Sequence, residues 1–79
     1  MTLQSWLQTV LIGLVNHPES ITITEKTDEQ GILLTISTHK EDLGVVIGRK
    51  GEHVNSLRTL LRACGHLQGI KASLKVIDN

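Results

Sequence analysis

One stretch of the chain decides how the residues on either side of it fold: Val46-Ile47-Gly48-Arg49-Lys50-Gly51-Glu52-His53-Val54. Two glycines enclose two adjacent cations, and apolar residues flank the whole. A bare Gly-x-x-Gly pattern is weak evidence, because roughly three or four in ten chains of this length contain one by chance. A purely structural turn between helices, however, has no use for paired cations at its tip. The context therefore favours a binding loop.

The chemistry of such a loop suits phosphate groups. Glycines let a backbone approach a ligand closely, and a helix beginning at Glu52 would present unpaired N–H groups and the positive end of its dipole. We therefore expect Gly48, Arg49, Lys50 and Gly51 to hold a sugar-phosphate backbone without reading its sequence.

Bases would then lie on the apolar surface beside the loop. Ile47, Val54 and part of the central strand are candidates, since RNA modules that read sequence usually take unstacked single strands. His53, in the first turn of the next helix, and Arg58 are further candidates for RNA contact. For both of these the alternative is a solvated surface side chain.

The N-terminal segment has the hydrophobic pattern of an amphipathic helix over residues 3–15. Its apolar positions are Leu3, Trp6, Leu7, Val10, Leu11, Leu14 and Val15. The helix is expected to end at Asn16-His17-Pro18, because a proline disfavours helical geometry at the residue before it.

Two runs with period-two alternation follow, over residues 21–25 and 32–37, and both predict strands. The polar residues 26–31 between them predict a hairpin connection. Leu33 adds an apolar side chain to the second face of the second strand, which is therefore expected to be central.

The loop separates two predicted helices. The first covers residues 40–47, and its acidic start, Glu41-Asp42, suits the positive end of a helix dipole. The second runs from residue 52 to residue 63 or 64, with Gly65 as its C-terminal cap. Its inward side chains are expected to be Val54, Leu57, Leu60 and Leu61. Residues 70–77 alternate again and predict a third strand.

The resulting order is α-β-β-α-α-β, an α+β fold in a single domain over residues 1–79. The two-helix connection between the last two strands spans about thirty residues, which is long enough to make them parallel and adjacent. We therefore expect a mixed three-stranded sheet with three helices packed on one face.

This order and the loop together resemble the KH domain, in particular the type II arrangement of bacteria. The apolar pair, the Gly-x-x-Gly and the apolar residue three positions later carry the resemblance, which extends over essentially the whole chain. The length is similar to that of the short, single-domain KhpA-like proteins.

That resemblance implies binding of single-stranded RNA in the cytoplasm, as an RNA chaperone or post-transcriptional regulator. It implies contact of residues 48–51 with the RNA backbone and of Ile47 and Val54 with bases. It also implies a homodimer, or a heterodimer with a larger RNA-binding protein that carries its own KH domain. The amino-acid composition of the chain indicates neither a second copy nor the larger protein as a partner.

The charge balance departs from that of a typical RNA binder, because eight Lys/Arg and eight Asp/Glu give a net charge of zero. Positive charge is concentrated between Lys40 and Arg62, and Glu52 directly after the loop weakens attraction for phosphate. The alternative function is a protein-interaction module, for dimerisation or scaffolding, that keeps the KH fold with weak or no RNA binding.

Other functions find little support in the chain. No Ser-His-Asp or Cys-His set is suggested, no P-loop is present, and we expect neither an enzyme nor a cofactor. The four histidines, His17, His39, His53 and His66, show no metal-ligand spacing. The single cysteine, Cys64, reads as a small apolar residue in a reducing cytoplasm. The apolar N-terminus is too short to span a bilayer.

Overall fold

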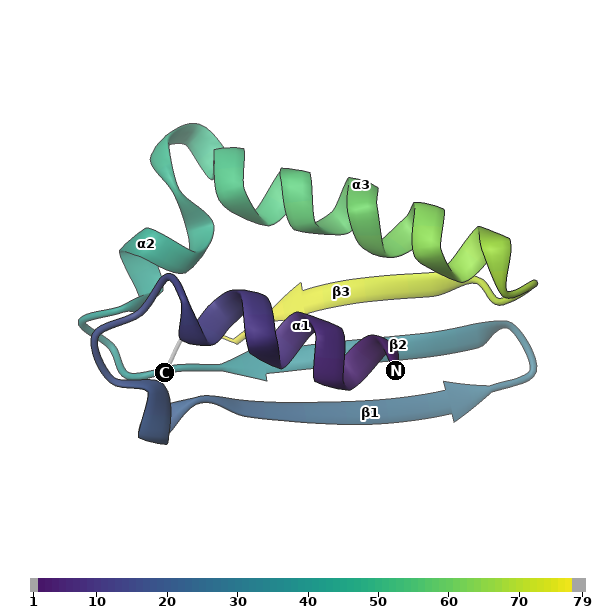
Figure 1. Cartoon of the computed structure of the whole chain (residues 1–79), viewed down its shortest axis with the longest axis horizontal. Coiled ribbons are helices and arrows are strands. Elements are labelled where there is room, and N and C mark those ends of the chain that lie inside the picture. The colour runs from purple at the N-terminus through teal and green to yellow at the C-terminus, as the bar shows by residue number, and fades with distance from the viewer. Residues whose placement is uncertain (1, 78–79) are drawn as a thin grey trace.

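The computed structural model describes residues 2–77 and confirms the α+β fold and its element order (Figure 1). Its elements are α1 (Leu3–Ile12), the 3-10 turn η1 (Pro18–Ser20), β1 (Thr22–Asp28), β2 (Gly31–Ser37), α2 (Leu43–Ile47), the 3-10 turn η2 (Arg49–Gly51), α3 (Glu52–Leu67) and β3 (Ala72–Val76). The strand order is β1-β2-β3, with β1 antiparallel and β3 parallel to β2. The second strand is therefore central, as predicted.

All three α-helices contribute to one core on one face of the sheet. The side chains of Leu34 and Ile36 in β2 and of Leu74 in β3 are buried beneath Leu7 of α1 and Leu61 of α3. Figure 1 shows α1 in front of the sheet and α3 running alongside β3. The other face of the sheet carries mostly polar side chains together with the half-buried Leu33, and no helix within residues 2–77 covers it.

The first helix is shorter than predicted. Thr2 caps its N-terminus by accepting the N–H of Ser5 at 3.1 Å, and the helix ends at Ile12 rather than at residue 15. Gly13 forms the C-cap, and the chain turns away there. Val15 still packs against the core from outside the helix, so the apolar periodicity of the sequence continues past the last helical residue.

The β-hairpin is tighter than predicted. The first strand extends to Asp28 and the second begins at Gly31, so the connection is only Glu29-Gln30 and not residues 26–31. The Asp28 carboxylate accepts the N–H groups of Gln30 and Gly31 at 2.8 and 3.1 Å, which closes the turn. The end of β1 is exposed on both faces, so its residues do not alternate between apolar and polar as those at the start of the strand do.

Two predictions for α3 are wrong. The helix continues through Gly65 to Leu67 and is capped at Gln68, so Gly65 is not its terminus. A Cβ at Gly65 would lie 2.6 Å from the carbonyl oxygen of Ile70, which shows that this glycine lets the helix approach β3 closely. Leu60, predicted to face inward, is 53% exposed. The buried stripe of the helix is formed instead by Val54, Leu57 and Leu61.

The last strand is shorter than the predicted 70–77, since only Ala72–Val76 pair with β2. Within residues 2–77, no helix has the length and apolar character needed to cross a membrane.

Two glycine substitutions distinguish close packing from helix propensity. Gly65→Ala should destabilise the fold by about 1–3 kcal/mol, because the added methyl group meets the Ile70 carbonyl. Gly44→Ala, in α2, meets nothing within 4 Å and should stabilise the fold by about 0.4–1 kcal/mol. Urea denaturation measures both, and a gain in stability for Gly65→Ala would contradict the packing described for α3 and β3.

Candidate nucleic-acid interface

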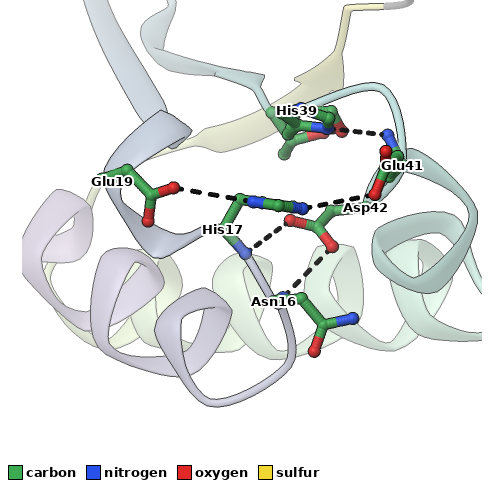
Figure 2. Close-up of polar contacts among 7 residues, drawn as sticks. Asn16, His17, Glu19, His39, Glu41 and Asp42 are labelled. Atoms are coloured by element: carbon green, nitrogen blue, oxygen red, sulfur yellow. Dashed lines mark hydrogen bonds and ion pairs between the residues drawn. The ribbon is translucent and has the colours of Figure 1, made fainter.

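The start of α2 is held by a buried carboxylate rather than by the helix dipole alone. Residues 40–42 form a turn, so α2 begins at Leu43 and not at residue 40. Asp42 is only 1% exposed and makes no side-chain cap bond to its own helix. Its two oxygens instead accept the backbone N–H groups of Asn16 and His17 at 3.1 and 2.9 Å (Figure 2). This contact ties the chain after α1 to the entrance of the loop region.

His17 lies at the same junction, beside several carboxylates. A hydrogen bond to Glu41, 3.3 Å from Nε2, raises the pKa of the His17 imidazole, and the charges of Asp42, Glu41 and Glu19 act in the same direction against the effect of desolvation.

The loop between α2 and α3 depends on backbone geometry that favours glycine. Gly48 and Gly51 have φ of 78° and 77°, and Lys50 between them has φ of 57°. The turn is closed by the N–H of Gly51, which donates to the carbonyl of Gly48 at 3.1 Å. A left-handed conformation costs a non-glycine residue about 1–2 kcal/mol, so Lys50 is held in a strained position at the tip.

Gly48 is required for a second reason, which is its contact with His53. A Cβ at Gly48 would lie 2.7 Å from the backbone nitrogen of His53 and 2.8 Å from its ring. The ring Nδ1 lies 2.6 Å from the carbonyl oxygen of Val45, and since a carbonyl only accepts, Nδ1–H is the donor. His53 therefore joins the end of α2 to the start of α3. The sequence predicted an RNA contact here, and in the neutral ring only Nε2 remains free to accept such a bond.

The cations of the loop are accessible. Arg49 and Lys50 are exposed, and Gly51, the N-cap of α3, has no side chain to cover the first turn of that helix. Glu52 is exposed beside them. The tip therefore presents two positive side chains and a helix N-terminus against one negative side chain, an arrangement suited to an anion.

The apolar surface beside the loop differs from the predicted one. Ile47 is half-buried next to the loop, as expected, but Val54 is 6% exposed and belongs to the core, so its side chain leaves little surface for a base. Leu34 and Ile36, on this face of the central strand, are also buried. Val45, which sequence reasoning missed, is 36% exposed and supplies the accessible apolar surface instead.

Arg58 lies farther along α3, about 10 Å from Gly51 along the helix axis. Its Nε donates to the carbonyl of Leu74 at 3.4 Å, and one terminal nitrogen donates to the Asn55 side chain at 3.4 Å. These contacts hold the guanidinium along the α3–β3 edge. Asn55 was missed by sequence reasoning, although its place four residues after Gly51 indicates the same helix face.

Comparison with known proteins agrees with this geometry. A family model described as KhpA/KhpB, KH domain, matches residues 4–76. The chain belongs to this family. The matched residues include the loop Gly48-Arg49-Lys50-Gly51, on which the resemblance to KH domains rested.

Curated relatives extend over nearly the whole chain. A protein of Listeria monocytogenes named RNA-binding protein KhpA is 32% identical over 96% of this chain and 100% of its own length. Proteins of the same name from Leifsonia xyli and Bacillus subtilis are 36% and 33% identical, over 89% and 87% of this chain and 90% and 85% of their own lengths.

Two glycines with similar backbone angles test the role of the His53 contact. Gly69→Ala, at φ of 72° with nothing within 4 Å of its Cβ, should cost about 1–2 kcal/mol of stability, the cost of a left-handed backbone alone. Gly48→Ala should cost more and should speed amide hydrogen exchange in residues 48–53, because the methyl group displaces the His53 ring. Equal losses without faster exchange at the loop would contradict this account.

Proposed function

We propose that this KH domain binds single-stranded RNA through the loop Gly48-Arg49-Lys50-Gly51. The observation that carries the proposal is the combination at one tip of two positive-φ glycines, two exposed cations and the uncovered N-terminus of α3. Backbone N–H groups and two positive side chains bind the sugar-phosphate backbone there, independently of base identity. The names of the curated relatives support RNA as the ligand.

Base contacts lie on either side of this clamp. Val45 and Ile47 offer apolar surface, and Asn55 and Arg58 offer polar groups along α3. Trp6, the single Phe, Tyr or Trp residue of the chain, is in α1 and packs against the core, so no large aromatic side chain provides a stacking platform at the loop. Since stacking on aromatic side chains contributes about 1–3 kcal/mol per base in many single-strand binders, we expect modest affinity and weak base preference.

The cellular role that fits such binding is that of a cytoplasmic RNA chaperone or post-transcriptional regulator, without catalysis. Weak, sequence-tolerant contacts let a protein act on many transcripts. Two linked copies raise effective affinity without any new contact, which compensates for the zero net charge. We therefore also propose that the chain works as a homodimer or beside a larger KH-containing RNA-binding protein.

A second candidate function is a protein-interaction module. Leu60 and Leu67, on the surface of α3, are 53% and 86% exposed, and this apolar area together with neutral charge favours a protein partner. The two functions differ in salt dependence, because phosphate contacts weaken steeply with salt and an apolar interface does not.

A charge reversal at the loop tests the proposal. Arg49 and Lys50 are both replaced by Asp, and binding of a fluorescent single-stranded RNA of mixed sequence is followed by anisotropy at about 50 and about 200 mM salt. Two phosphate contacts predict a wild-type affinity that falls by at least about sevenfold over this range. The variant should lose at least about tenfold at low salt while its circular dichroism spectrum stays unchanged.

The matched control replaces Lys71 and Lys75, both exposed near β3, by Asp, which makes the same change in net charge. Unchanged RNA binding in the loop variant, or an equal loss in the control, would overturn the assignment to the loop. Absence of wild-type binding at low salt would favour the interaction module instead.

A further inference from the structure

Two histidines far apart in the sequence meet at the junction below α2. His17 precedes η1, and His39 follows β2. Their rings are stacked, with centroids 4.1 Å apart and an interplanar angle of 21°. The carboxylate of Glu41 completes the group, with Oε2 at 3.3 Å from Nε2 of His17 (Figure 2).

We propose that His17, His39 and Glu41 form a binding site for a divalent transition-metal ion of the zinc type. One ligand atom from each residue lies within 4.8 Å of the other two. Zinc bonds of 2.0–2.2 Å in a tetrahedron separate neighbouring ligand atoms by about 3.3 Å, a separation already present between His17 and Glu41. Imidazole and carboxylate ligands suit zinc, nickel and copper, and three protein ligands leave a fourth position for water.

The surroundings of His17 distinguish this group from a chance cluster of acidic residues. Its Nδ1 lies 3.6 Å from Oε1 of Glu19, on the side of the ring opposite Glu41. Metal-bound histidines commonly donate their second ring N–H to a carboxylate, which fixes the tautomer and the ring orientation. The negative charge of Glu19 favours a proton at Nδ1, so Nε2 can give up its hydrogen bond to Glu41 and direct its lone pair to a metal.

His39 must give up one hydrogen bond to coordinate. Its Nδ1 accepts the N–H of Glu41 at 3.1 Å. A metal at Nδ1 replaces this bond directly. A metal at Nε2 moves the ring proton to Nδ1, which then can no longer accept it. The bond is solvent-exposed, so water replaces it for the amide. The stacked rings must also turn, because an imidazole lone pair lies in the plane of its ring, and all three ligand side chains are exposed or half-buried and can do so.

The backbone beneath the site is already fixed. The buried Asp42 carboxylate binds the N–H groups of Asn16 and His17, so the two segments that carry the ligands are joined before any metal arrives. Coordination would add a second link between the chain after α1 and the chain entering α2. The sequence predicted no metal site because these ligands lie on separate segments, without a local spacing motif.

Isothermal titration with ZnCl₂ and thermal melting in excess ZnCl₂ or EDTA test the proposal. One Zn²⁺ should bind per chain, raising the melting temperature by at least about 5 °C with zinc in large excess over its Kd. The Nε2 nitrogen resonance of His17 should shift on binding, which identifies the coordinating atom. The measurements are repeated with Cys64→Ser, because a thiolate is also a zinc ligand.

His39→Ala and Glu41→Gln should each weaken zinc binding by at least about tenfold while melting like the wild type in EDTA. His66→Ala, at an exposed histidine in the last turn of α3, is the matched control and should bind as the wild type does. Absence of binding, loss of binding in Cys64→Ser, or equal losses in His66→Ala and His39→Ala would overturn the proposal. None of these outcomes depends on whether the domain binds RNA.

Discussion

The close approach of α2 to α3 at Gly48 determines how these two helices pack against each other. Because Gly48 has no Cβ, the backbone and ring of His53 can lie directly against it, and the ring can bond to the last turn of α2. The two helices are thus joined at an angle that buries Val46 and Val54 in the same core. The residues between the glycines have no place in that core and are exposed.

The opposite end of α2 is held just as firmly, by the Asp42 carboxylate. A helix as short as Leu43–Ile47 has little stability of its own, since isolated helices below about 12 residues are marginal in water. Its position is set instead by contacts at both ends: Asp42 with the chain after α1, and His53 with the carbonyl of Val45. The loop cations are therefore presented from a fixed support, which limits the ordering that ligand binding requires.

Sequence periodicity predicted what depends on local pattern, and it failed where contacts between distant segments decide. The helical and alternating patterns identified the element order, the central strand and the core face, because burial must follow the period of each element. Gly65 and Leu60 were misread because close packing of α3 on β3, and not helix termination or hydrophobicity, determines their positions. The loop residues could be proposed from the sequence because the glycines and cations are contiguous. Asp42 binds the chain near Asn16, and His17 stacks on His39, across more than twenty residues of sequence. Contacts between such distant segments leave no pattern in the local sequence.

Nuclear magnetic resonance can show residue by residue whether RNA touches the loop tip, as we propose. A ¹⁵N-labelled chain is titrated with single-stranded RNA of mixed sequence, and the change in each backbone amide shift is measured. We expect the largest changes in residues 48–53, smaller ones along α3 as far as Arg58, and none around Lys71 and Lys75. Largest changes on the open face of the sheet, or around Leu60 and Leu67 with the loop unaffected, would contradict it.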